Sequence, residues 1–326
     1  MRLAFVGKGG SGKTTLSSLF ARYATRRGPV VAIDADINQH LGLALGLDRG
    51  LTDGLDGGLA GGTAGHPPPL GGMLTEIKDY LRGDNPLIRD TASMVKTTPP
   101  GRGSRLVRLN DPFFPSRSVE GVSLMVTGPF EENDLGVACY HSKLGAVELY
   151  LNHLVDGPGE YVVVDMTAGA DSFASGLFTR FDLTILVAEP TRQGVSVYRQ
   201  YRDHAAGFDV EIAVVGNKIH APEDVDFLRE HVGDDLLTWF GHSPAIRGME
   251  QGRPFTLDAL EPAGHLALAT MLDRLDAQPK NWTKFGRQAA EFHIRNAHAW
   301  ANRATGEDLV AQIDPGFVYG PAVASS

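Results

Sequence analysis

Residues 3–15 read Leu-Ala-Phe-Val-Gly-Lys-Gly-Gly-Ser-Gly-Lys-Thr-Thr, and this stretch decides the fold of the chain. A short apolar run enters a glycine-rich loop, and a helical stretch from Lys13 to about Arg26 follows it. Residues 7–14 match the pattern G-x-x-x-x-G-K-[ST] in the strand–loop–helix setting that it requires. Glycines let backbone N–H groups close around phosphate oxygens, and the helix N-terminus adds its positive dipole. The stretch therefore predicts a phosphate-binding loop.

The residues after the last glycine indicate which phosphate compound binds. In such loops the lysine reaches the β- and γ-phosphates of a nucleotide, and the following hydroxyl ligates Mg²⁺. We expect Lys13 and Thr14 to have these roles in binding Mg·ATP. An ordinary glycine-rich turn explains the pattern less well, because strand, loop, Lys-Thr and helix are all in register. The predicted nucleotide-binding residues are Gly7, Lys8, Gly9, Gly10, Ser11, Gly12, Lys13, Thr14 and Thr15.

Short apolar runs recur along the chain, and each ends at a polar turn. They lie at residues 30–33, 122–126, 161–164, 183–187 and 211–215, usually with a helical stretch before the next run. Runs without apolar/polar alternation suit strands that are buried on both faces. We therefore predict an α/β fold with a mostly parallel, doubly wound sheet. Ligands of such sheets bind beyond the carboxyl ends of the strands.

Composition narrows the class of protein. Of the 326 residues, 42% are apolar, and 30 Lys plus Arg against 39 Asp plus Glu give a net charge of -9. This balance disfavours a nucleic-acid-coating protein. Cys139 is the only cysteine, so a disulfide within one chain is impossible. No apolar run approaches the roughly 20 residues of a transmembrane helix, and the first strand leaves no room for a signal peptide. We expect a cytoplasmic protein.

Polar residues at the ends of three strands are further candidates for the site. Asp34 and Asp36 follow the second apolar run, Asp165 follows residues 161–164, and Asn217 follows residues 211–215. Carboxylates near a γ-phosphate position Mg²⁺ or the attacking water. Strand-terminal Asp residues also cap turns, but two acidic motifs beside one phosphate loop favour function. For Asn217 alone, a generic turn is nearly as good an explanation.

Lys8 gives the loop the form Lys-Gly-Gly-x-Gly-Lys-Thr, which resembles the deviant Walker A group. That group includes the MinD and ParA partition ATPases, the nitrogenase iron protein and the CooC-type nickel-insertion ATPases. The resemblance implies a P-loop NTPase fold of the MinD/CooC type and an ATP-sandwiched homodimer, in which Lys8 contacts the phosphates of the opposite subunit. It also implies that Asp36 polarises the attacking water and that Asp34 acts through the water shell of Mg²⁺. By the same match, Asp165 is the Walker B acid and Asn217 reads the adenine edge.

Several stretches are similar to the CooC branch, and the resemblance covers roughly residues 1–275. They are residues 162–169, 187–192 and 108–110 (Val-Val-Val-Asp-Met-Thr-Ala-Gly, Val-Ala-Glu-Pro-Thr-Arg and Arg-Leu-Asn). That branch has Cys-x-Cys where this chain reads Cys139-Tyr140-His141. Cys and His ligate Zn²⁺ or Ni²⁺, so the pair is a candidate interface metal site, although a core thiol and a surface histidine, taken alone, explain it slightly better. Thr167 stands where the branch has glutamate. The iron protein is excluded, because it needs two cysteines per subunit.

Two segments interrupt the strand–helix pattern. Residues 49–116 are rich in glycine and proline, so we expect an insertion that buries little core and is partly disordered, with one helix at 73–81. From residue 276 to 326 we expect a helical extension and tail. Its apolar face packs on the domain or on a partner and comprises Phe285, Ala289, Phe292 and Trp300. Residues 1–275 form the predicted ATPase domain.

Together, these features predict a dimeric ATPase that hydrolyses Mg·ATP and drives maturation or metal loading of a client protein. The alternative is a ParA- or MinD-like partition ATPase that acts on DNA or membrane. A basic dimer face or a strongly amphipathic terminal helix would favour this alternative.

Overall fold

The computed structural model describes residues 1–47, 66–129, 140–167, 173 and 176–322. The apolar runs in these residues form an 8-stranded sheet in the order β3-β4-β2-β5-β1-β6-β7-β8. Neighbouring strands are parallel except for β3 and β4 at one edge. The prediction of a mostly parallel sheet is therefore confirmed. The strands are β1 (Arg2–Gly7), β2 (Val30–Ala35), β3 (Arg117–Val119), β4 (Val122–Val126), β5 (Tyr161–Met166), β6 (Leu183–Ala188), β7 (Ile212–Ile219) and β8 (Leu236–Gly241).

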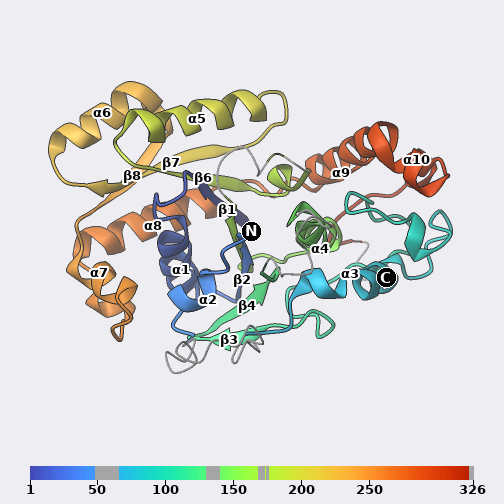
Figure 1. Cartoon of the computed structure of the whole chain (residues 1–326), viewed down its shortest axis with the longest axis horizontal. Coiled ribbons are helices and arrows are strands. Elements are labelled where there is room, and N and C mark those ends of the chain that lie inside the picture. The colour runs from blue at the N-terminus through green and yellow to red at the C-terminus, as the bar shows by residue number, and fades with distance from the viewer. Residues whose placement is uncertain (48–65, 130–139, 168–172, 174–175, 323–326) are drawn as a thin grey trace, which may run out of the picture.

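Helices cover both faces of the sheet (Figure 1). Along β1, Ala4 and Val6 pack into one core, whereas Leu3 and Phe5 pack into the other, as expected when successive side chains point to opposite faces. On the first face lie α3 (Leu74–Arg82), α4 (Tyr140–His153), α5 (Arg192–Ala205) and α6 (Pro222–Val232). On the second lie α1 (Lys13–Ala24), α2 (Leu41–Ala44), α7 (Pro244–Glu250) and α8 (Pro262–Asp276). No helix in these residues is long and apolar enough to cross a membrane.

Some element boundaries differ from the expected ones. Strand β7 does not end at Val215 but continues through Asn217 to Ile219, with an irregular register against β8. Strands β3 and β8 were not expected from the sequence. Both are edge strands with partly exposed residues. Strand β3 (Arg-Ser-Val) lacks an apolar run, whereas residues 236–240 of β8 read Leu-Leu-Thr-Trp-Phe, a run that the sequence analysis overlooked.

The expectation of a coreless insertion is wrong for residues 66–116. The predicted helix is present as α3, and the long connection around it contributes buried side chains to the first core. They are Leu70, Ile77, Leu81, Ile88, Met94, Val107, Leu109 and Phe114. Glycine and proline content alone misled the prediction, because widely spaced apolar residues suffice when a neighbouring helix, here α4, supplies the opposing surface. Residues 48–65 lie outside the described part of the chain.

The C-terminal segment packs on the sheet domain through α9 (Trp282–Asn296), which is followed by a short π-helical segment and by α10 (Asn302–Thr305). Phe285, Ala289 and Phe292 are buried, as expected for one apolar helix face, and the Phe292 ring meets Phe178 edge-on at 5.4 Å. Trp300 departs from the expectation, because it is 43% exposed. The proposed domain boundary near residue 275 stays a prediction.

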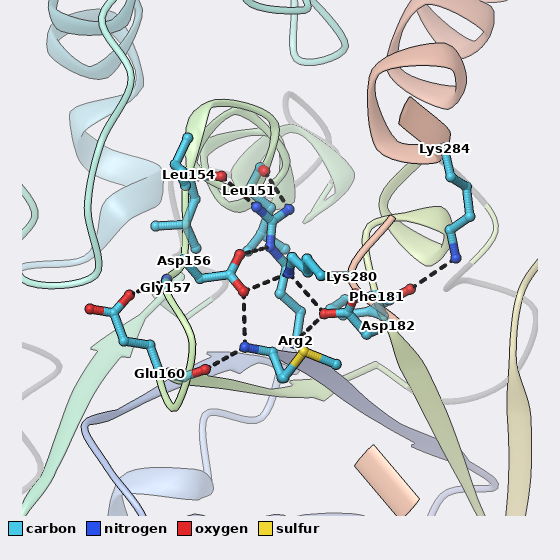
Figure 2. Close-up of polar contacts among 12 residues, drawn as sticks. Arg2, Leu151, Leu154, Asp156, Gly157, Glu160, Phe181, Asp182, Lys280 and Lys284 are labelled. Atoms are coloured by element: carbon cyan, nitrogen blue, oxygen red, sulfur yellow. Dashed lines mark hydrogen bonds and ion pairs between the residues drawn. The ribbon is translucent and has the colours of Figure 1, made fainter. Parts of the chain in front are cut away.

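A buried cluster of charges links this segment to the start of β1 (Figure 2). The guanidinium of Arg2, at the start of β1, donates to the carboxylate of Asp156 at 2.8 Å and to the carbonyl of Leu151 at 2.8 Å. Lys280, which lies between α8 and α9, donates to Asp156 at 2.5 Å and to Asp182 at 2.9 Å. The two buried carboxylates thus join the first strand, the residues after α4 and the C-terminal segment.

Candidate functional site

The glycine loop between β1 and α1 has the backbone that its sequence predicts. Gly10 and Gly12 have φ angles of 81° and 96°, in the left-handed region that other residues avoid. A Cβ atom on Gly12 would lie 2.2 Å from the Nδ2 atom of Asn217, so a side chain there would displace that amide. The Ser11 N–H donates to the carbonyl of Lys8 at 3.1 Å. Helix α1 begins at Lys13, which places its N-terminus at the end of the loop.

The two lysines of the loop have different surroundings. Lys13 is buried, with 6% of its surface exposed, and its positive charge opposes the raised pKa of Asp165. The ammonium group of Lys8 donates to the Oε1 atom of Gln193, on α5, at 2.6 Å, and this contact is exposed. Lys13 therefore belongs to the interior of the site, whereas Lys8 lies at its rim.

Parallel pairing brings the expected carboxylates together. Asp34 on β2 lies opposite Asp165 on β5, and β5 pairs on its other side with β1, which leads into the glycine loop. The hydroxyl of Thr14 donates to the Oδ2 atom of Asp165 at 2.6 Å. Residues from three distant parts of the sequence thus meet at the carboxyl ends of the central strands.

Asp165 is fully buried, and its carboxyl is strongly perturbed by its surroundings. Burial raises the pKa of its carboxyl to about 7, and the nearby charge of Asp36 adds to the rise, whereas Thr14 and Lys13 oppose it. Its Oδ1 atom is buried without a hydrogen-bond partner among the described residues. A buried acceptor without a partner is costly, so a cation or a water at Oδ1 would relieve that cost.

Asp34 and Asp36 shape the loop after β2. The Oδ2 atom of Asp34 accepts from the N–H of Leu41 at 2.8 Å, and its Oδ1 atom accepts from the N–H of Asp36 at 3.2 Å. Burial and the neighbouring Asp165 raise the pKa of Asp34 well above its ordinary value. Asp36 accepts through Oδ1 from the N–H of Asn38 at 2.9 Å. Asp34 is thus held by the loop, while the second oxygen of Asp36 lies outside these hydrogen bonds.

The donor set is compatible with Mg²⁺. Mg²⁺ in nucleotide sites takes one or two carboxylates, and phosphates and waters supply its other ligands. Thr14 and the unpartnered oxygen of Asp165 suit that coordination. Among the described residues, no group of three or more His, Cys, Asp or Glu is arranged to hold a metal by itself. Cys139 lies outside the described residues, as does the side chain of His141, so the proposed Zn²⁺ or Ni²⁺ site stays a prediction.

A cavity of about 210 Å³ adjoins the start of α1. Asn217 borders it, and its amide donates to the carbonyl of Ser11 at 2.7 Å. On the opposite side, the hydroxyl of Thr15 donates to Glu250, at the end of α7, at 2.9 Å. The structure thus places Asn217 beside the loop, with its amide turned to the loop backbone. Its predicted contact with adenine stays a prediction.

Sequence reasoning missed several side chains that contact the loop or support such a contact. Lys218 directly follows the predicted Asn217, and Glu189 lies in the quoted stretch 187–192, but neither has a role predicted from the sequence. Gln193 and Glu250 had no signal in the sequence, because a lone polar residue in a helix is usually a surface residue.

Two known proteins are similar to this chain over most of its length. No family model matches the chain. It is 27% identical over 288 residues to the carbon monoxide dehydrogenase accessory protein CooC of Rhodospirillum rubrum, which covers 84% of this chain and 97% of that protein. It is also 26% identical over 267 residues to an uncharacterised ATP-binding protein of Methanocaldococcus jannaschii, with 79% and 92% covered.

A solved structure shares the fold. The septum site-determining protein MinD of Pyrococcus horikoshii, complexed with Mg-ADP, superposes with a TM-score of 0.50 at 17% identity, covering 85% of this chain and 97% of that one. The sequence similarity over most of the chain and the shared fold agree with the class of protein that the glycine loop predicts. The chain is thus similar to the P-loop ATPases of the MinD/ParA type in the sequence of its glycine loop and in its fold.

Proposed function

We propose that the protein is a nucleotide-switched homodimer that uses ATP hydrolysis to drive maturation or metal loading of a client protein. The observation that carries the hydrolytic part is the contact of 2.6 Å between Thr14 and Asp165 beneath the glycine loop. The client role is supported by the similarity to an accessory protein over 97% of that protein's length.

The chain's own residues supply most of the chemistry. Lys13 and the loop N–H groups bind the β- and γ-phosphates and stabilise the charge that develops on them. Asp36 orients a water molecule toward the γ-phosphorus and attracts its proton. As the water oxygen bonds to phosphorus, the bond to the β–γ bridging oxygen breaks, and ADP and phosphate result. Lys8, at the rim, reaches the nucleotide of the partner subunit.

Thr14 and Asp165 hold Mg²⁺ in this proposal, and Asp34 acts through its water shell. When bound, Mg²⁺ would offset negative charge on the phosphates. The fit rests on the unpartnered Oδ1 atom of Asp165. Asn217 borders the adjoining cavity, and in this proposal it contacts the base.

The assignment of Lys13 is tested by Lys13→Ala in a phosphate-release assay with Mg·ATP. Loss of a charged donor from the transition state typically costs about 10²–10³ in turnover, and ATP binding should fall as well. Lys78→Ala, which removes a lysine from α3 outside the site, is the matched control. Turnover that survived in Lys13→Ala would refute the assignment.

Asp36→Ala separates binding from chemistry. The variant should bind ATP with nearly unchanged affinity but lose hydrolysis, because the water is no longer oriented. Asp79→Ala, an exposed acid on α3, serves as the control. Hydrolysis at the wild-type rate would show that Asp36 only stabilises its loop.

The Asp36→Ala variant also tests the biological role, because it should stay ATP-loaded. We expect it not to sediment with duplex DNA or with vesicles of anionic lipid. Sedimentation with either one, dependent on ATP, would replace the client role with partition or positioning.

A further inference from the structure

Strand β7 is distorted where it passes the glycine loop. Its register against β8 shifts between Val214 and Val215 and again between Gly216 and Ile219. Within this irregular stretch Lys218 has a φ of 59°, a left-handed conformation that is rare for a residue with a side chain. Such strain persists only where surrounding contacts hold it, and it is concentrated at functional sites.

The distortion lets two adjacent side chains reach the same loop. In a regular strand they would point to opposite faces of the sheet. Here the amide of Asn217 donates to the carbonyl of Ser11 at 2.7 Å, and the ammonium of Lys218 donates to the carbonyl of Gly10 at 2.7 Å. Two consecutive carbonyls of the phosphate loop thus accept hydrogen bonds from the side chains of two consecutive residues of one strand.

These contacts determine where the loop N–H groups point. In a trans peptide the C=O of one residue and the N–H of the next point in opposite directions. Fixing the Ser11 carbonyl therefore fixes the Gly12 N–H, and fixing the Gly10 carbonyl fixes the Ser11 N–H, which closes the turn to Lys8. A loop whose N–H groups are already oriented binds phosphate without first losing conformational freedom.

A second set of contacts supports the arrangement. The Lys218 ammonium also donates to the Oε1 atom of Glu189, which follows β6, at 2.6 Å. Asn217 lies so close that a Cβ atom on Gly12 would be 2.2 Å from its amide nitrogen. The glycine at position 12 is thus matched to the side chain of Asn217.

We propose that Asn217 and Lys218 are positioning residues that hold the phosphate loop in its anion-binding form, with Glu189 orienting the lysine. The proposal rests on the nucleotide site assigned above and adds phosphate binding to the role of Asn217. Its consequence is specific: both residues strengthen binding of any ligand with a polyphosphate chain, whether or not the ligand has a base.

Calorimetric titration of ATP, GTP and inorganic tripolyphosphate, each with Mg²⁺, tests this. Lys218→Ala and Asn217→Ala should weaken tripolyphosphate binding on the order of 3–10-fold each, the range for the net loss of one hydrogen bond. Lys218→Ala should weaken ATP and GTP by the same factor. Lys218→Arg, which keeps a long cationic donor, should bind within about threefold of wild type. Lys78→Ala is the matched control, and circular dichroism establishes that each variant is folded.

The outcomes separate the proposal from the function on which it rests. If the wild type binds neither ATP nor tripolyphosphate, the nucleotide site itself is wrong. If the wild type binds both and Asn217→Ala weakens ATP alone, then Asn217 reads only the base. If Lys218→Ala leaves tripolyphosphate affinity unchanged, or if Lys218→Arg loses as much as Lys218→Ala, the lysine does not position the loop.

Discussion

Replacing Asp156 by Asn should destabilise the protein more than any other single Asp-to-Asn change outside the nucleotide site. Its side chain is 1% exposed and forms ion pairs with Arg2, with Lys280 and with the amino group of Met1. Burial opposes its negative charge, but Arg2 and Lys280 more than compensate and hold the pKa of the carboxyl below its ordinary value. Asn would leave the fully buried Arg2 without its carboxylate partner.

Removing one partner of a buried ion pair typically costs about 3–5 kcal/mol. A loss of 1 kcal/mol lowers the melting temperature by about 2–4 °C in chains of 150–250 residues, and by less in longer ones. We therefore expect a fall on the order of 5–10 °C for Asp156→Asn. The matched control is Asp273→Asn, which removes an exposed partner of Arg27 and should cost at most about 1 kcal/mol.

Urea unfolding followed by circular dichroism measures both variants. Because the folded-state pKa of Asp156 is lowered, its contribution is complete above the pKa of about 3.9 for an unfolded Asp and is lost as the pH falls below it. The difference in free energy of unfolding between wild type and Asp156→Asn should therefore be constant near neutral pH and shrink only below about pH 4. A difference under about 1 kcal/mol at pH 7, equal to that of the control, would refute the reasoning.

Three further predictions concern other parts of the chain. ATP, but not ADP, should tighten a homodimer in light scattering, and Lys8→Ala should weaken that response; a dimer indifferent to nucleotide and to Lys8 would point to another interface. Zinc or nickel should bind at one ion per dimer and be lost in Cys139→Ser and His141→Ala, whereas binding that survived both changes would place the metal elsewhere. Burial lowers the pKa of His153 to about 4, although its contact with Leu149 opposes this. In the unfolded chain, His153 thus binds more protons than in the folded protein between about pH 6.5 and 4. The stability of the fold should therefore decrease as the pH drops through that range, and His153→Leu should make this decrease smaller.

The sequence predicted the interior of the sheet well. Buried parallel strands require continuous apolar runs, so β2, β4, β5 and β6 were found at nearly their observed positions. Strand β3 was missed because its three residues carry no such run, whereas the run Leu-Leu-Thr-Trp-Phe of β8, at the other edge of the sheet, was overlooked. In residues 66–116 the glycine and proline content hid a contribution to the core that depends on packing against α4.

For the site, the sequence found the residues whose role follows from local pattern. Lys13 and Thr14 were identified by the loop, and the structure places Thr14 against the predicted Asp165. The contacts of Lys218 with Gly10 and with Glu189 were not predicted, because they depend on a distortion of β7 that no residue pattern marks.

The sequence by itself determined the phosphate loop. Its strand, its glycines with left-handed backbone and the beginning of its helix lie within fifteen consecutive residues, so the loop can be recognised without any distant partner. Only the tertiary structure decided which distant residues complete it. The order of the strands places β5 and β6 on either side of β1 and β7 beyond β6, and so brings Asp165 and Lys218 to the loop from positions 151 and 208 residues away from their partners Thr14 and Gly10. That order results from the packing of helices on both faces of the sheet, which depends on the whole chain and not on any one segment of it.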